Sequence, residues 1–387
     1  LEGPSATYNI PLVLTFDTNI DIAKFEQAVQ KVANRHEILR TKYPSSKGVP
    51  YQLVEEGKVN FEVVTVDKEE EASAIEQATR YAFDLKCEPG FKVTIINESI
   101  AVFTMHHISS DGWSLSALAE DLQTALKGQL TPLPIQYADF AHWQQRFLEQ
   151  PSDGVPLQDR ELQYWKEQLE GIPHETELLT DRKRMPNPQA QGDVLKFVIP
   201  KELHKELLEL AKSHNVTLYM ILLGAFSAMA TKLGAGEDIV VGSPVAGREN
   251  EETLNLIGMF INTLVMRVDT SGNPEFEQLI ERVRATSIGA YEHQHIPFDR
   301  LVEQLNPERV TSRHPLFQIM FALQNTPMPS LEIDGHHAEM ELHTVGLSKF
   351  DLSIEMRELH QGETANGIET MVEFRTDLYD MDTIEML

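Results

Sequence analysis

The sequence predicts an α/β protein built from layers of helices packed against β-sheets. Strand patterns and helix patterns alternate along the first half of the chain, which is typical of this class. The 387 residues are enough for two domains, each with its own hydrophobic core. Residues 151–156 (PSDGVP) have the best linker composition near the middle of the chain. We therefore expect domains at residues 1–155 and 156–387.

Local patterns place the elements of the first half. Short runs of apolar and β-branched residues predict strands at 8–16, 51–54, 61–66, 91–97 and 100–107. Apolar residues at helical spacing predict helices at 22–33, 69–81 and 115–126. Asp21 is of a type that caps helix N-termini, and Pro132 and Pro134 break the chain after the last of these helices.

The second half carries longer apolar runs. We expect helices at 164–169, 201–213 and 216–233, and strands at 238–247, 257–267, 317–324, 349–354 and 374–379. The longest apolar stretch, residues 218–230, is too short to span a bilayer. It therefore predicts a helix in the protein core.

Composition limits the function. The chain has 33 basic and 60 acidic residues, a formal net charge of −27, which argues against nucleic acid or an anionic membrane as partner. The single cysteine, Cys87, cannot form an intramolecular disulfide, so we expect a cytoplasmic, reducing setting. The chain begins with Leu1 and has no secretory signal, and we take it to be part of something longer.

One stretch concentrates residues that can carry chemistry. His106, His107, Asp111 and Gly112 form the pattern H-H-x-x-x-D-G between a predicted strand and a predicted helix. Neighbouring side chains of a strand point to opposite faces, so we expect one histidine inside and the other exposed to substrate. This opposite facing disfavours a metal site. A structural role and a catalytic role remain, since a neutral imidazole can accept a proton from an attacking group.

Asp111 and Gly112 fit either role. The carboxylate of Asp111 can orient the chemistry or cap the following helix. Gly112 has no side chain and lets a ligand approach the backbone closely.

Six segments resemble, in order, the motifs of the condensation domains of non-ribosomal peptide synthetases, which belong to the chloramphenicol-acetyltransferase-like superfamily. They are residues 35–43, 106–112, 137–143, 257–267, 293–299 and 309–316. The chain departs from the family pattern where Tyr43 replaces Phe, Ile261 replaces Val, Asp299 replaces Glu, and Val310 and His314 replace Asp and Asn. His36 is a weak functional candidate in the first of these segments. His293 and His295 have a spacing that could serve a metal only with further ligands, so we expect them to pack or to face solvent.

The resemblance implies a fold and an activity. It implies two acetyltransferase-like lobes in a V arrangement with a central tunnel. The activity would be amide formation between a donor aminoacyl or peptidyl thioester and an acceptor amine. Both would ride on phosphopantetheine arms, one on an upstream donor carrier protein and one on a downstream acceptor carrier protein. Adjacent synthetase domains in the same polypeptide are expected, and no cofactor bound to this domain itself.

The resemblance also assigns roles to residues. His107 would face the tunnel as general base or as hydrogen-bond anchor for the amine, and His106 would be structural. Asp111 would hold the loop, and Gly112 would leave room for substrate. Arg267 is the suggested partner of Asp111, although it could instead be an exposed residue at a strand end. Trp113 and Ser114 are the candidates for lining the tunnel.

Rival functions stay open. Epimerization domains lack a glycine at the position of Gly112, and heterocyclization domains replace the histidine pair by an aspartate-based motif. An acyltransferase that uses a soluble thioester or a free amine is a closer alternative. A non-catalytic domain that recruits a partner enzyme is another, and the intact His107 disfavours it.

Overall fold

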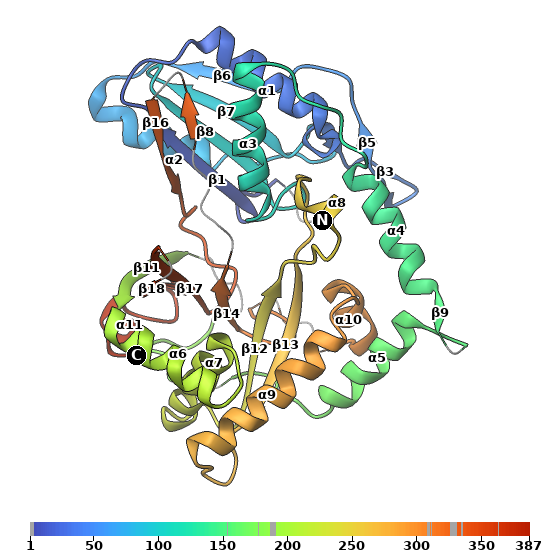
Figure 1. Ribbon diagram of the computed structural model, residues 1–387, viewed down its shortest axis with the longest axis vertical. Coiled ribbons are helices and arrows are strands. Elements are labelled where there is room, and N and C mark those ends of the chain that lie inside the picture. Colours follow the sequence, from blue (N-terminus) through green and yellow to red (C-terminus); the bar gives the residue numbers. More distant parts are fainter. Residues whose placement is uncertain are drawn as a thin grey trace. The chain divides into compact units, whose positions relative to one another are not determined.

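The computed structural model describes residues 4–152, 154–176, 178–185, 191–307, 310, 312–325, 331–333, 336–362 and 364–387 (Figure 1). Asp153 of the predicted linker, and Arg309 and Thr311 of the last motif, lie outside this part of the chain. The fold is mixed α/β, as predicted. No helix in the described ranges is both long enough and apolar enough to cross a membrane.

The chain forms two compact units whose boundaries differ from the predicted domains. Unit 1 comprises Leu1–Arg146, Ala246–Ile261 and Thr326–Val345, and unit 2 comprises Phe147–Val245, Asn262–Asn325 and Gly346–Leu387. The first boundary between the units thus comes nine residues before the predicted domain boundary. Two later segments, Ala246–Ile261 and Thr326–Val345, also belong to unit 1. The predicted linker forms a small hairpin instead, in which β9 (Pro151–Ser152) pairs with β10 (Val155–Pro156).

Unit 1 is built on a six-stranded sheet in the order β15-β16-β1-β8-β7-β6. Its strands are β1 (Asn9–Thr15), β6 (Asn60–Val64), β7 (Phe91–Ile96), β8 (Ile100–His106), β15 (Leu331–Ile333) and β16 (His336–Leu342). All neighbours are antiparallel except β6 and β7. The short strands β2 (Thr41–Lys42), β3 (Ser45–Ser46), β4 (Val49–Pro50) and β5 (Leu53–Val54) pair outside this sheet.

Helices cover both faces of this sheet because successive side chains of a strand point to opposite faces, and here both faces carry apolar side chains. Leu12, Phe103 and Met105 share a core with helices α1 (Ile22–Arg35) and α3 (Ser114–Lys127), which lie side by side in Figure 1. Val13 and Val102 point the other way, to α2 (Glu71–Thr79). The remaining helical elements of this region are η1 (Glu37–Arg40), η2 (Lys68–Glu70), α4 (Tyr137–Glu149) and α8 (Glu251–Leu254).

Unit 2 has a second six-stranded sheet, in the order β11-β18-β17-β14-β12-β13. Its strands are β11 (Gly192–Ile199), β12 (Asp238–Val245), β13 (Asn262–Asp269), β14 (Ile319–Gln324), β17 (Leu352–Gln361) and β18 (Thr364–Arg375). Strand β14 runs parallel to β12 and to β17, and the other pairs are antiparallel. The helices are α5 (Leu157–Gln168), α6 (Lys201–Ser213), α7 (Leu218–Lys232), α9 (Phe276–Glu292), α10 (Phe298–Leu305) and α11 (Met381–Met386).

The apolar stretch at 218–230 lies in the core of unit 2, as its composition predicted. Helix α7 buries Leu223 and Phe226 against Val241 of β12 and Val283 of α9. The strand predicted at 257–267 begins only at Asn262, because residues 257–261 leave the sheet of unit 2 and pack in unit 1. Sequence patterns did not reveal helices α9 and α10.

Candidate active site

Strand β8 ends at the two histidines, and neighbouring backbone holds both of them. The N–H of His106 donates to the carbonyl of Gly90 at 2.8 Å, just before β7. The N–H of His107 donates to the carbonyl of Tyr8 at 2.7 Å, just before β1. The start of the motif is therefore fixed from the strands on both sides of β8, which makes it a rigid support for chemistry.

His106 lies among aromatic side chains. Its ring centroid is 6.0 Å from that of Tyr8 and 6.4 Å from that of Phe83. Its Nδ1 accepts the N–H of Ile108 at 3.1 Å, so that nitrogen carries no proton in this arrangement. These contacts support the structural role that we assign to His106.

The backbone turns sharply after β8, and His107 lies in this turn. The N–H of Ser109 donates to the carbonyl of His106 at 2.8 Å, and the N–H of Ser110 lies 3.4 Å from the carbonyl of His107. His107 is half-buried, whereas Ser109 and Ser110 have no exposed surface. His107 is thus partly accessible on a turn in which Ser109 and Ser110 are enclosed, although its Nδ1 is buried.

Asp111 anchors the far side of the turn. It is 3% exposed. One carboxylate oxygen accepts the N–H of Ser114 at 2.9 Å, the hydroxyl of Ser114 at 2.7 Å and a guanidinium N–H of Arg248 at 2.9 Å. The other oxygen accepts the N–H of Phe260 at 3.0 Å. This carboxylate therefore joins the first residue of α3 to the segment Ala246–Ile261, both within unit 1.

The predicted pairing of Asp111 with Arg267 is wrong. Arg267 donates to both carboxylate oxygens of Asp238, at 2.8 to 3.2 Å, and to the carbonyls of Gln168 and Glu170, all within unit 2. Its strand β13 pairs with β12, which brings Asp238 within reach on the adjacent strand. Asp238 raises the pKa of Arg267.

The arginine that pairs with Asp111 is Arg248, and not Arg267 as the sequence suggested. Its side chain is only 1% exposed. Besides Asp111, it donates to the carbonyls of Thr253 and Leu256, and it lies 4.0 Å from the centroid of the Phe260 ring. Burial lowers the pKa of Arg248, and the charge of Asp111 opposes that shift. One feature of the sequence could have pointed to Arg248, because it is a charged residue close after an apolar strand, in the run Val245-Ala246-Gly247-Arg248.

The other predicted site residues, Gly112, Trp113 and Ser114, differ in how much of their surface is exposed. Gly112 is exposed, and a Cβ built on it meets no atom within 4 Å, so there is room beside its backbone. Trp113 is half-buried. Ser114 has no exposed surface, and its hydroxyl interacts with Asp111 and with the backbone of Gly258. Ser114 therefore supports the loop and does not line an open passage, contrary to the prediction.

His36 is a second buried support of the same segment. It is 1% exposed, and its Nε2 lies 2.6 Å from a carboxylate oxygen of Asp121, which also pairs with Arg35. Its Nδ1 accepts the N–H of Ile257 at 3.3 Å. Burial lowers the pKa of His36, and the hydrogen bond with Asp121 opposes that shift. A ring that is neutral, with the proton on Nε2, satisfies both contacts.

The histidines of the fifth motif make contacts within unit 2. His295 lies 2.7 Å from the buried carboxylate of Glu161, and His293 stacks on Tyr164 with 3.9 Å between ring centroids. Within the described ranges, no three His, Cys, Asp or Glu side chains are grouped so that they could hold a metal ion.

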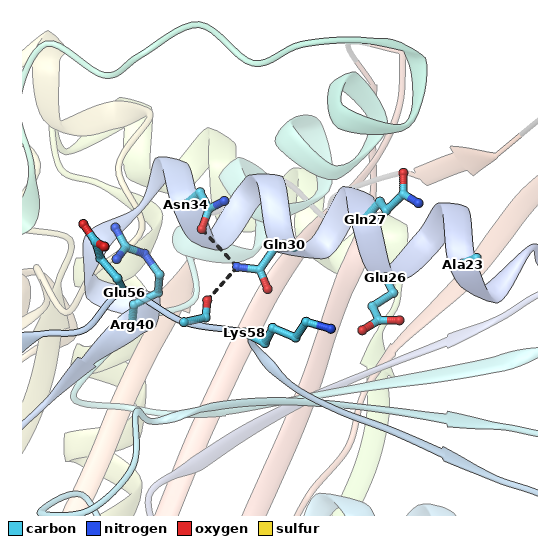
Figure 2. A pocket seen from close by; sticks show the side chains of 9 residues that line it. Ala23, Glu26, Gln27, Gln30, Asn34, Arg40, Glu56 and Lys58 are labelled. Atoms are coloured by element: carbon cyan, nitrogen blue, oxygen red, sulfur yellow. Dashed lines mark hydrogen bonds between the residues drawn. The ribbon is translucent and has the colours of Figure 1, made fainter.

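A polar groove of about 730 Å³ lies elsewhere in unit 1. Its lining comes from α1, from Arg40 and from residues 56–58, as Figure 2 shows. On one side of the groove, the side-chain amide of Gln30 donates to the Oδ1 of Asn34 at 3.0 Å and to the carbonyl of Gly57 at 3.1 Å. The lining does not include the histidines of the motif, so we assign the groove no part in the chemistry.

Comparison with known proteins defines the class. The family model described as "Condensation domain" matches residues 1–387, and the chain belongs to this family. It is 41% identical over 402 residues to a dimodular nonribosomal peptide synthase of Bacillus subtilis (strain 168). It is 43% identical over 397 residues to a probable non-canonical nonribosomal peptide synthetase, CymA, of Salinispora arenicola (strain CNS-205). Each alignment covers 100% of this chain but only 17% and 5% of the two relatives.

Solved structures confirm the fold. The X-domain in a complex with OxyB from teicoplanin biosynthesis matches with a TM-score of 0.87 and 26% identity, over 99% of this chain and 86% of that one. A four-domain nonribosomal peptide synthetase bound to AMP and glycine matches with a TM-score of 0.84 and 22% identity, over 98% of this chain and 30% of that one. The resemblance found in the sequence is thus confirmed at the level of family and fold.

Proposed function

We propose that the chain forms an amide bond between a donor aminoacyl or peptidyl thioester and an acceptor amine, each presented on the phosphopantetheine arm of a carrier protein. The amine nitrogen attacks the thioester carbonyl carbon and forms a tetrahedral intermediate. The nitrogen gives up one proton, the carbon–sulfur bond breaks, the acyl group stays on the acceptor, and the donor arm takes up one proton and leaves as a thiol. The upstream and downstream carriers would belong to adjacent synthetase domains, in a cytoplasmic setting.

The observation that carries this proposal is the half-buried imidazole of His107 on a turn fixed at both ends. The backbone of Tyr8 holds one end, and the buried pair of Asp111 and Arg248 holds the other. Alignment of two tethered reactants lowers a barrier by roughly 7 to 11 kcal/mol in favourable cases. Proton transfer by a positioned group typically adds about 10²- to 10⁴-fold. His107 therefore acts as general base or as hydrogen-bond anchor on the attacking amine.

The test is peptide formation from two loaded carrier proteins. We expect His107→Ala to lower the rate about 10²-fold or more, because proton acceptance and orientation are both lost. His107→Gln keeps a hydrogen-bonding group but cannot accept the proton, so recovery in this variant would assign the anchor role. His337→Ala is the matched control, since that imidazole is 80% exposed on β16, and it should be as active as the wild type. An unchanged rate in His107→Ala removes the imidazole from the mechanism.

Two alternatives are separated by the same assay. An enzyme for soluble substrates would work equally fast when pantetheine thioesters and free amines replace the carriers. Recruitment of a partner enzyme is the second candidate, favoured by the match to an X-domain solved in complex with OxyB. Absence of product from the wild type with either form of substrate would support recruitment.

A further inference from the structure

Residues 256–260 belong to no helix or strand, yet they pack inside unit 1. Ile257 is 1% exposed and lies in the core that α1 and α3 share. A buried stretch without strand partners needs other partners for its backbone, since an unpaired N–H or carbonyl group in the interior is costly. In this segment, side chains supply those partners.

Residues of the motif and of the start of α3 hold two backbone groups of this segment. The N–H of Phe260 donates to a carboxylate oxygen of Asp111 at 3.0 Å. The N–H of Gly258 donates to the hydroxyl of Ser114 at 3.1 Å. Asp111 and Ser114 both follow His107 closely in the chain and also bond to each other. A displacement of the segment is therefore transmitted to the turn that carries His107.

A third backbone group of the segment is held from outside the motif. The N–H of Ile257 donates to Nδ1 of His36 at 3.3 Å. His36 directly follows α1 and is 1% exposed. Ile257 precedes Gly258 in the chain, so this bond fixes the segment one position before its contact with Ser114.

The bond to Ile257 depends on which ring nitrogen of His36 carries the proton. Nε2 lies 2.6 Å from one carboxylate oxygen of Asp121, and the other oxygen of Asp121 pairs with Arg35. A carboxylate without a proton can only accept, so it keeps the proton of the neutral ring on Nε2. Nδ1 is then an acceptor. Asp121 thus selects the form of the ring that binds Ile257.

We infer that His36 is a positioning residue for the proposed reaction. Its neutral imidazole holds the N–H of Ile257. The segment 256–260 in turn holds Asp111 and hence the turn that carries His107. This inference rests on the proposed function of His107. Small displacements of a reacting group have large effects on rate, so loss of the bond to Ile257 acts on the chemical step more than on carrier binding.

Two substitutions separate the two nitrogens of His36. His36→Asn places its amide oxygen where Nδ1 lies and so keeps an acceptor for Ile257. His36→Gln reaches Asp121 with its amide N–H but offers no acceptor at the position of Nδ1. The assay is peptide formation with loaded carriers, at a temperature at which every variant is folded. We expect His36→Gln to lower kcat about 10-fold with unchanged KM for the acceptor carrier, and His36→Asn to stay within about 2-fold of the wild type.

His204 in unit 2 is the matched control. It is 0% exposed, its Nε2 lies 2.9 Å from a carboxylate oxygen of Glu358, and its Nδ1 accepts the N–H of Gly367 at 3.3 Å. His204→Gln removes the same kind of bond within unit 2 and should leave kcat unchanged. An unchanged kcat in His36→Gln, equal losses in His36→Asn and His36→Gln, or an equal loss in His204→Gln would overturn the inference.

If His36→Gln does not fold, Asp121→Asn tests the same bond. Arg35 can only donate, so it keeps the amide oxygen, and the amide N–H then faces Nε2 of His36. The ring proton moves to Nδ1, which can no longer accept the N–H of Ile257. This variant should lower kcat as His36→Gln does, and an unchanged kcat would count against the inference.

A second measurement keeps the inference testable if the wild type makes no product, an outcome that would reject the proposed function alone. The amide signal of Ile257 and the imidazole signals of His107 can be followed by NMR without substrate. His36→Gln should shift the signals of both residues, and His204→Gln should leave them unchanged. His107 signals that are identical in the wild type and in His36→Gln would show that the bond to Ile257 does not act on this residue.

Discussion

At the scale of single residues, the pair of Asp111 and Arg248 shows what a buried charge requires. Both side chains are almost fully enclosed, at 4% and 1% exposure, and each charge is held by the other and by backbone groups. Taking a charge out of water is costly unless partners replace the lost hydration. The pair therefore specifies where the segment Ala246–Ile261 lies on unit 1, because either charge alone is unfavourable there.

We expect Arg248→Ala to lower the free energy of unfolding by about 3–5 kcal/mol, since it leaves the carboxylate of Asp111 buried without its cation. Arg267→Ala is the matched control. Arg267 pairs with Asp238 at 24% and 36% exposure, so its loss should cost only about 1 kcal/mol. Urea unfolding of the wild type and both variants measures the difference. Equal losses in the two variants would contradict the assignment of Arg248 as the buried partner.

At the scale of elements, local sequence patterns predicted the parts of the site that depend on neighbours in the chain. Strand β8, the following turn and helix α3 were predicted because alternation and helical spacing are local properties. The partner of Asp111 lies 137 positions away, and no local pattern distinguishes Arg248 from Arg267. The resemblance also suggested the wrong arginine. Only the three-dimensional path of the chain shows which arginine is enclosed beside the carboxylate.

The loop before β7 supports the motif turn through Gly90. A Cβ at this position would lie 2.8 Å from the Cβ of His106 and 2.9 Å from the hydroxyl oxygen of Ser109, so either the turn or the loop must move. We expect Gly90→Ala to lower the free energy of unfolding by about 1–3 kcal/mol and to reduce peptide formation, because overpacking displaces the turn. Gly57→Ala is the control, since nothing lies within 4 Å of a Cβ built there. Thermal unfolding and the carrier assay measure both effects, and equal behaviour of the two variants would argue against a tight contact.

At the scale of the whole molecule, the sequence predicted two parts but not how the chain is divided between them. The size of the chain and a linker-like composition suggested a single crossing near residue 155, whereas Ala246–Ile261 and Thr326–Val345 return to unit 1. In the second of these segments β16 pairs with β1, a backbone pairing between residues more than 300 positions apart. Such pairing depends on which sheet edge is free, and composition does not record that.

The stability of the molecule should also depend on pH through His314 in unit 2. Its ring lies 4.6 Å from that of Phe317 and 4.9 Å from that of Phe350, measured between centroids, and burial lowers its pKa from 6.5 to about 4. Between these two values the unfolded chain binds a proton that the folded chain does not. The stability that the neutral ring of His314 contributes is therefore fully present above about pH 6.5 and is lost as the pH falls toward 4. Over this range the free energy of unfolding falls by about 1 kcal/mol per pH unit.

The variant His314→Asn removes this titration and restores the residue of the family pattern. Urea unfolding at pH 7 and pH 5 should show a smaller loss of stability for His314→Asn than for the wild type over this interval, because only the wild-type ring must remain neutral in the apolar cluster. His142→Asn on α4 is the control, since that side chain is exposed and should leave the pH dependence of the wild type unchanged. Equal slopes for the wild type and His314→Asn would mean that the ring is protonated inside the folded protein, and the enclosure by Phe317 and Phe350 would then have to open as the pH falls.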